Sequence, residues 1–201
     1  MKRDLRAPIL TCALLAVGLL AGGAVQAGPA LPAEGRVEVG FAPWDDVERL
    51  VMDQIDGAKQ AVYVQAYMLT SRQIAKTLIA AHERGLKVEV IADREKVLKD
   101  EYSALPRVAG HGVPLWLDGA YSAAHSKVMI IDPDGKDPVV VTGSYNFSVA
   151  GKSKNAENVL VLSGQRALAA LYMQNWKRHR AQSVSFADAV QETLRGEAVT
   201  P

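Results

Sequence analysis

One short segment carries residue types that can act on a phosphate ester. It reads His125-Ser126-Lys127-Val128-Met129-Ile130-Ile131-Asp132. Its apolar residues predict a strand, and in a strand residues i and i+2 point to the same face. We therefore expect His125 and Lys127 to lie side by side. A histidine titrates near neutral pH and a neighbouring ammonium supplies a fixed positive charge, so the pair suits attack on a phosphodiester.

A second segment follows the next strand-like run, Val139 to Thr142. It reads Gly143-Ser144-Tyr145-Asn146-Phe147-Ser148. Ser144 and Asn146 can donate hydrogen bonds to one phosphate, and Gly143 allows the backbone to approach closely. Taken alone, these are ordinary turn residues. Their position after the histidine and lysine is what favours a phosphate-binding site.

Together these residues resemble the signature of the phospholipase D superfamily, H-x-K-x4-D followed by a glycine–serine segment with an asparagine. The resemblance is to its small bacterial endonucleases, which have one signature per chain, and it runs from about Val37 to Arg178. It implies a phosphodiesterase that needs no metal or other cofactor. The roles it implies are catalysis by His125, Lys127 and Glu157, phosphate binding by Lys127, Ser144 and Asn146, and structural support from Asp132 and Gly143. In that family the glutamate holds the histidine ring.

The resemblance also implies two facing histidines. One attacks phosphorus and forms a phospho-histidine, and the other protonates the leaving group. This chain has one signature, because His82, His111 and His179 lack the lysine and aspartate that would follow. The second histidine must then come from another copy of the chain, and a twofold axis places identical patches against each other. We expect a homodimer with a shared site at its axis.

The order of sequence patterns predicts an α/β fold. The expected strands are 36–41, 60–68, 86–91, 113–117, 127–131, 139–142 and 157–162, and the expected helices are 45–57, 73–84 and 165–180, with a helical or irregular stretch at 93–110 broken at Pro106. Because strands and helices alternate in the first half, we predict a mixed, largely parallel sheet with helices on both faces. Residues after Ser183 are polar and are expected to be loosely held.

The first 27 residues have the pattern of a secretory signal: a basic start, an apolar stretch and small residues before Gly28. A retained membrane anchor is the alternative, but Pro8 and the lack of a basic flank on the far side favour removal. The expected organisation is a signal peptide at 1–27, a flexible leader at 28–35, a phospholipase D-like nuclease domain at 36–183 and a C-terminal tail at 184–201. The mature protein would be periplasmic or secreted, with no stable membrane anchor.

The net charge excludes a strongly basic nucleic-acid binder. The chain has 23 basic and 22 acidic residues, and removal of residues 1–27 leaves 20 and 21, a net charge of −1. Any affinity for phosphate must therefore come from a local cluster of charges. The one cysteine, Cys12, lies in the expected signal, so the mature chain has no disulfide and no cysteine metal site.

Three functions stay open. The favoured one is a secreted, metal-independent endonuclease that cleaves DNA or RNA with little sequence preference, because a small chain has few loops to shape a lipid-specific pocket. The same residues could instead hydrolyse phospholipid head groups, although no basic amphipathic helix stands out for membrane binding. A non-catalytic phosphate-binding module is disfavoured, because the full set of chemical residues is present.

Other residues receive structural interpretations. Three aromatic residues are assigned to the core: Tyr145, Phe147 and Trp176. Lys152 and Lys154 either guide a nucleic-acid backbone or are simply solvated. Asp93 either lies near the site or caps the helix that follows it. The turn 133–138 is long for a hairpin and could reshape the cleft.

Overall fold

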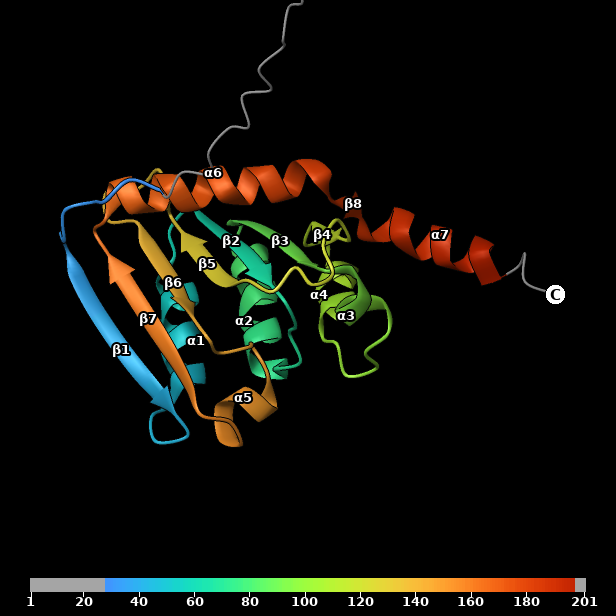
Figure 1. Ribbon diagram of the computed structural model, residues 1–201, viewed down its shortest axis with the longest axis horizontal. Coiled ribbons are helices and arrows are strands. Elements are labelled where there is room, and N and C mark those ends of the chain that lie inside the picture. Colours follow the sequence, from blue (N-terminus) through green and yellow to red (C-terminus); the bar gives the residue numbers. More distant parts are fainter. Residues whose placement is uncertain (1–27, 198–201) are drawn as a thin grey trace, which may run out of the picture. The chain divides into compact units, whose positions relative to one another are not determined.

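One mixed sheet, with strand order β1-β7-β6-β5-β2-β3-β4-β8, organises residues 36–197 (Figure 1). This computed structural model describes residues 28–197. The strands are β1 (Arg36–Ala42), β2 (Ala61–Ala66), β3 (Lys87–Asp93), β4 (Leu115–Asp118), β5 (Lys127–Ile131), β6 (Val139–Gly143), β7 (Glu157–Ser163) and β8 (Val184–Ser185). The expected signal segment and residues 198–201 lie outside the described residues. Within the described part of the chain, no helix has the length and apolar character needed to span a bilayer.

The directions of the strands differ from the expectation. Only the pairs β2–β3 and β3–β4 are parallel, whereas the other five pairs are antiparallel. The mixed α/β fold is confirmed, but the prediction of a largely parallel sheet is wrong. The physical reason is the second half of the chain, where the turn 133–138 makes a hairpin of β5 and β6, and hairpins pair strands antiparallel.

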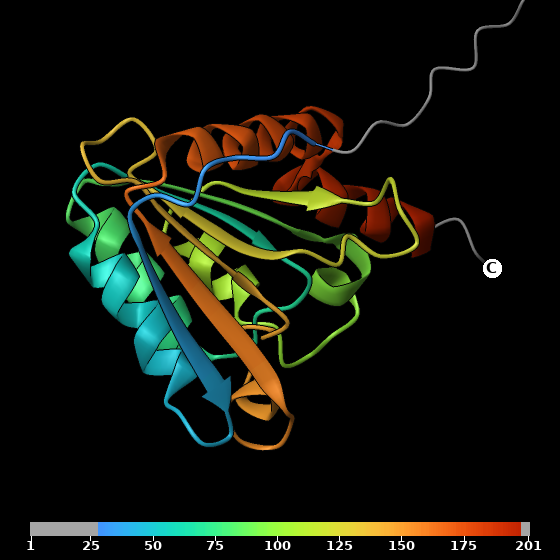
Figure 2. The same cartoon turned by 60° about the vertical axis from the view of Figure 1, so that its left-hand side comes forward.

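Helices cover both faces of the sheet (Figures 1 and 2). The helices are α1 (Val47–Gly57), α2 (Arg72–Glu83), α3 (Arg94–Leu98), α4 (Leu105–Gly110), α5 (Val149–Ser153), α6 (Arg166–Gln182) and α7 (Phe186–Glu197). The helices α1 and α2 pack on one face, while α6 crosses the other. The sheet thus has an apolar cluster on each side.

Local sequence explains where several helices begin. Asp46, Ser71 and Ser148 each accept a hydrogen bond from the backbone N–H three residues later, at 3.0, 3.1 and 3.0 Å. Such side chains satisfy donors that the first helical turn leaves unpaired. Pro106 stands in the first turn of α4, where a proline is tolerated, so it starts a helix rather than breaking one.

The aromatic residues assigned to the core are buried. Tyr145 and Phe147 are 1% and 2% exposed, and Trp176 is 3% exposed. The Trp176 indole also donates to the carbonyl oxygen of Val64 at 3.0 Å, which ties α6 to the centre of the sheet. The core interpretation of these three residues is confirmed.

The C-terminal segment is ordered by contacts with the sheet. Strand β8 pairs with β4, Ala189 of α7 is fully buried, and Arg94 forms an ion pair with Glu192 at 2.8 Å. The expectation of a loosely held tail is therefore wrong for residues 184–197. Apolar residues at helical spacing give α7 a face that packs against the rest of the fold.

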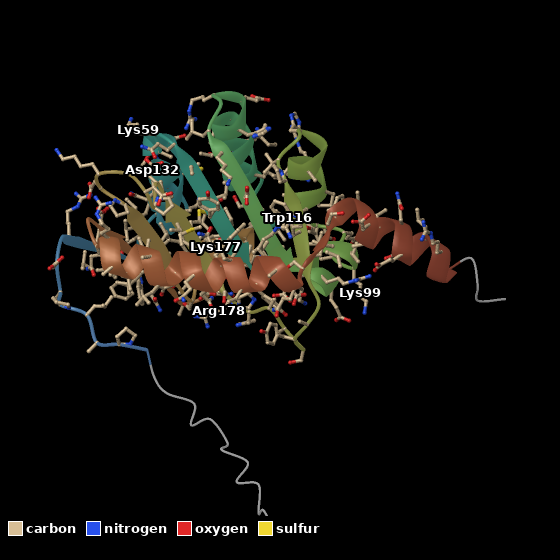
Figure 3. The ribbon with its side chains drawn as sticks, turned by 90° about the horizontal axis from the view of Figure 1, so that it is seen from above. Lys59, Lys99, Trp116, Asp132, Lys177 and Arg178 are labelled. Atoms are coloured by element: carbon tan, nitrogen blue, oxygen red, sulfur yellow. The ribbon has the colours of Figure 1, made fainter. Side chains whose placement is uncertain are left out.

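Asp132 anchors the carboxyl end of β5 to the start of β2 through hydrogen bonds. Its Oδ1 accepts hydrogen bonds from the backbone N–H groups of Gln60 and Ala61 at 2.7 and 2.8 Å, and its Oδ2 accepts one from Lys59 at 2.7 Å. Figure 3 shows Asp132 beside Lys59. It lies five positions along the chain from Lys127, roughly 16 Å away in an extended strand. The carboxylate therefore holds β5 against β2 and lies far from the histidine–lysine pair.

Replacement of Asp132 should act on stability. We expect Asp132→Ala to lower the free energy of unfolding by about 2–4 kcal/mol, because three backbone donors lose a charged acceptor. Urea unfolding followed by circular dichroism measures this. Asp134→Ala, an exposed change in the same turn, is the control and should have little effect. Equal stability of the two variants would contradict the anchoring role.

Candidate active site

The amino end of β5 brings His125 and Lys127 together. Lys127 pairs with Ala66 of β2, and both side chains point to the sheet face that α1 and α2 cover. Its Nζ lies 2.8 Å from His125 Nδ1 and 2.6 Å from the carbonyl oxygen of His125, to which it donates. The side-by-side arrangement expected from strand alternation is present.

The Lys127 ammonium is an unusual charge because the residue is only 7% exposed. Burial lowers the pKa of Lys127 from its usual 10.5, and the negative charge of Glu157 acts in the opposite direction. An ammonium has three donors and no acceptor, so it donates to Nδ1 of the histidine. The neutral ring then carries its proton on Nε2, where it can donate a hydrogen bond to a phosphate oxygen.

Tyr67 completes this corner, and sequence reasoning missed it. Its ring centroid lies 4.3 Å from that of His125, and the Nζ atoms of Lys127 and Lys96 lie 4.9 and 5.3 Å from it. Its backbone N–H donates to the carbonyl oxygen of Ser126 at 2.8 Å, which continues the pairing of β2 with β5. The available signal was position, because Tyr67 directly follows the buried strand that neighbours the histidine–lysine strand.

Ser144 is oriented by its neighbour across the sheet. Its Oγ accepts hydrogen bonds from the backbone N–H and the side-chain amide of Asn158, at 3.0 and 3.3 Å. Both lone pairs of the hydroxyl are then used, and its proton stays available for an incoming oxygen. Gly143 has a φ of +151°, and a Cβ at this position would collide with the carbonyl oxygen of Asn158. Glycine is required here by both conformation and space.

Asn146 and Glu157 are the remaining residues of the predicted set. The Oδ1 of Asn146 is buried without a hydrogen-bond partner among the described residues. Such an acceptor calls for a donor from outside the fold, such as water or a substrate hydroxyl. Glu157 accepts a hydrogen bond from the side chain of Asn155 at 3.0 Å. Its carboxylate makes no hydrogen bond to His125 in this structure, so its expected role in holding the ring stays a prediction.

Two buried carboxylates hold the loop that leads to His125. Asp93 Oδ2 accepts from the backbone N–H of Ala124 at 2.8 Å, and Asp118 Oδ1 accepts from that of Ala120 at 3.1 Å. Asp93 also caps α3, so both of the roles considered for it are present. Asp118, which lies opposite Asp93 on β4, also contacts His179 of α6. Together these bonds fix both ends of the loop.

The other histidines lie in separate environments. His179 pairs with Asp118 at 2.6 Å, and His111 lies 3.6 Å from Glu83. Across residues 28–197, no three side chains of the His, Cys, Asp and Glu types are grouped so that they could hold a metal ion. Within residues 28–197, the candidate site therefore consists of His125, Lys127, the uncharged side chains of Ser144 and Asn146, and the carboxylate of Glu157.

Sequence and structure comparisons find relatives of this chain among phospholipase D proteins. Residues 51–180 match the model of a protein family described as cardiolipin synthase, PLD-like domain. A phospholipase D from Rickettsia felis is 36% identical over 148 residues, 74% of this chain and 71% of its own. The crystal structure of a phospholipase D family member, Nuc from Salmonella typhimurium, has a TM-score of 0.69 and 31% identity over 75% of this chain and 97% of its own. The mitochondrial cardiolipin hydrolase of Xenopus tropicalis is 26% identical and covers 60% of this chain and 55% of its own.

The buried charge gives a test that separates chemistry from stability. We expect Lys127→Met to lower the rate of phosphodiester hydrolysis about 100-fold or more, as removal of one transition-state donor does. Because burial lowers the pKa of Lys127, its unfavourable effect on stability is complete below the lowered pKa and is relieved as pH rises toward 10.5. Methionine removes the charge, so the unfolding midpoint at neutral pH should equal or exceed that of the wild type.

Thermal unfolding and hydrolysis of bis(p-nitrophenyl) phosphate measure the two effects. Lys177→Met, an exposed change on α6, is the control and should alter neither. A marked fall in the unfolding midpoint of Lys127→Met would show that the ammonium stabilises the fold, contrary to the unfavourable effect expected from its burial.

Proposed function

We propose, from the premise that the chain belongs to the phospholipase D superfamily and is a phosphodiesterase, that it is a metal-independent endonuclease acting on DNA or RNA. The observation that carries the proposal is the contact between His125 and the buried ammonium of Lys127. Ser144, with its available hydroxyl proton, follows the end of β6, the strand paired with β5. These neighbouring strand ends offer a proton-transfer group, a fixed positive charge and a neutral donor. Those are the groups that a phosphodiester needs.

The reaction has two steps. In the first, Nε2 of one His125 attacks phosphorus, a P–N bond forms, and the P–O bond to the leaving nucleotide breaks as a second histidine, protonated on both ring nitrogens, gives that oxygen its Nε2 proton and becomes neutral. In the second, water attacks phosphorus and loses a proton to the second histidine. The P–N bond then breaks, and the first histidine regains its starting state. Lys127 and Ser144 stabilise the negative charge on the phosphate oxygens throughout.

The attacking histidine needs the opposite tautomer from the one that Lys127 favours. Its Nε2 must have a free lone pair, so Nδ1 must carry the proton and donate it to an acceptor. We assign Glu157 as that acceptor, reached when the ring turns from the lysine toward it. The charge of Glu157 already raises the pKa of Lys127, which supports its closeness to the site.

A second copy of the chain supplies the second histidine in this proposal. The described chain carries one histidine–lysine pair, and a twofold axis beside it would bring the two pairs together. Each His125, Lys127, Ser144 and Asn146 would then occur twice around one phosphate. The function thus depends on a homodimer.

The choice of nucleic acid over lipid rests on the size of the chain. The match covers 97% of the Nuc chain and 75% of this one, so the part of this chain that carries the site is about as small as that protein and has few loops to shape an acyl-chain pocket. Phospholipid is the second candidate substrate, because relatives are named phospholipase D and mitochondrial cardiolipin hydrolase. The signal-like pattern of residues 1–27 supports a periplasmic or secreted enzyme without a stable membrane anchor.

The first test uses the mature protein and supercoiled plasmid in excess EDTA. We expect the wild type to nick the plasmid and His125→Ala to leave it intact, because the nucleophile is lost while no metal is needed. Gel electrophoresis separates the two forms of plasmid. Cleavage that returns only when a divalent metal is added would contradict the phospho-histidine route. No cleavage by either protein, together with hydrolysis of phospholipid vesicles, would favour the lipid substrate.

The second test concerns the shared site. Differently tagged wild-type and His125→Ala subunits are refolded together, and the heterodimer is purified through both tags. We expect its activity to fall to near the level of the His125→Ala homodimer, because one histidine cannot both attack and protonate in the same step. A heterodimer of wild-type and Lys177→Gln subunits, prepared in the same way, is the control. Half or more of the wild-type activity in the His125→Ala heterodimer would overturn the shared site.

A further inference from the structure

A groove of about 1270 Å³ is lined by residues of α2, of α5 and of the segment between α3 and α4. It is larger than the roughly 300–1,000 Å³ of most small-molecule sites. Its basic lining residues are Arg72, Lys76, Arg107, Lys152 and Lys154. We call it the α2–α5 groove.

Most of the positive charge in the α2–α5 groove is uncommitted. Lys152 is neutralised, because its Nζ lies 2.5 Å from the buried carboxylate of Glu48. The other four basic side chains are exposed, and none has an ion pair within residues 28–197. The acidic residues Asp100 and Glu101 lie along one side, on the segment before α4. Four free cations against two acids leave the groove net positive in a protein whose mature charge is close to zero.

An aromatic side chain stands in the same groove. Tyr102 is 73% exposed, and its backbone N–H is fixed by a hydrogen bond to Asp100 at 3.0 Å. A large exposed ring on a short, tied segment is a surface on which an unpaired base can stack. Cationic side chains beside an exposed ring are the combination that binds single-stranded nucleic acid.

Two segments that line the α2–α5 groove continue the chain directly from residues of the active site. Met68 of its lining follows Tyr67, which contacts the His125 ring, and Ser148 lies two residues beyond Asn146. The backbone N–H groups of Thr70 and Ser71 both donate to the carbonyl oxygen of Phe147 at 3.0 Å, which joins these two segments. The groove also lies on the side of the sheet where Lys127 points. A strand bound at the site can therefore extend toward the groove.

We propose that the α2–α5 groove binds the single strand of nucleic acid that extends from the scissile phosphate, with Arg72, Lys76, Arg107 and Lys154 on its backbone and Tyr102 under a base. This inference rests on the proposed function, and it adds a preference for unpaired strands longer than a dinucleotide. A duplex has its bases stacked inside and offers none to the ring. The groove thus sets substrate length and strandedness without touching the reacting atoms.

The test compares two matched pairs of substitutions. Arg72→Gln with Lys76→Gln removes two groove charges from α2, and Lys177→Gln with Arg178→Gln removes two exposed charges from α6 on the opposite face (Figure 3). We expect the groove pair to raise the KM for a long single-stranded oligonucleotide about tenfold, and the α6 pair to leave it unchanged. The slope of log KM against log salt concentration should fall by about 1.4 for the groove pair, the loss of two single-strand phosphate contacts.

A small substrate separates this inference from the proposed function. Hydrolysis of bis(p-nitrophenyl) phosphate, which cannot reach the groove, should be equal in the wild type and both pairs. Tyr102→Ala should raise the KM for the long strand about tenfold, and Tyr102→Phe should not, because phenylalanine keeps the stacking face.

Two outcomes would overturn the inference. If the wild type cuts nucleic acid but the groove pair matches the α6 pair at every strand length and salt concentration, the groove has no role and the proposed function stands. If the wild type hydrolyses bis(p-nitrophenyl) phosphate and anionic phospholipid vesicles but no nucleic acid, the proposed function fails and the inference falls with it.

Discussion

The register between β2 and β5 determines where the chemical groups of this protein point. These strands join the parallel part of the sheet to its antiparallel part, and their pairing is held at one end by the three hydrogen bonds of Asp132. At the other end, the Tyr67 N–H continues the ladder to Ser126. A slip of one residue would turn Lys127 from the face of α1 and α2 to that of α6. The site therefore depends on a carboxylate that lies at the opposite end of the strand.

That register forces a charge into an apolar setting. Lys127 shares its face with core residues of β2 and β5, and the free energy of burying its ammonium is offset only in part by His125 and the nearby Glu157. Buried charges of this kind seldom stabilise a fold. Their use here is electrostatic: a positive charge in surroundings with little water acts more strongly on a phosphate than the same charge at the surface. The apolar core around Lys127 and the loop before His125, which is hydrogen-bonded to Asp93 and Asp118, hold the histidine and the lysine in place.

The spacing of residues in the sequence predicted those features that depend on residues close together in the chain. Strand alternation placed His125 beside Lys127, and Asp93 was identified as a possible cap of the helix that follows it. Contacts between distant segments could not be predicted from spacing. One example is the hydrogen bond from the backbone N–H of Ala124 to the carboxylate of Asp93, 31 residues away. Strand direction failed for a related reason, because alternating patterns do not distinguish a hairpin from a crossover when the connection is irregular. The packing of α7 was missed because a polar segment can still present one apolar face.

The proton positions explain why one subunit is insufficient for the proposed reaction. A nucleophile needs a free lone pair at Nε2, whereas the histidine that protonates the leaving group must carry a proton on both ring nitrogens. Two identical subunits can meet this demand only by holding their rings in different protonation states. Both rings carry a proton on Nδ1 during the reaction, so each turns from Lys127 toward Glu157, which requires no movement of the sheet. Asymmetry at a twofold axis then arises from a single proton, which the second histidine gives to the leaving group in the first step and replaces from water in the second.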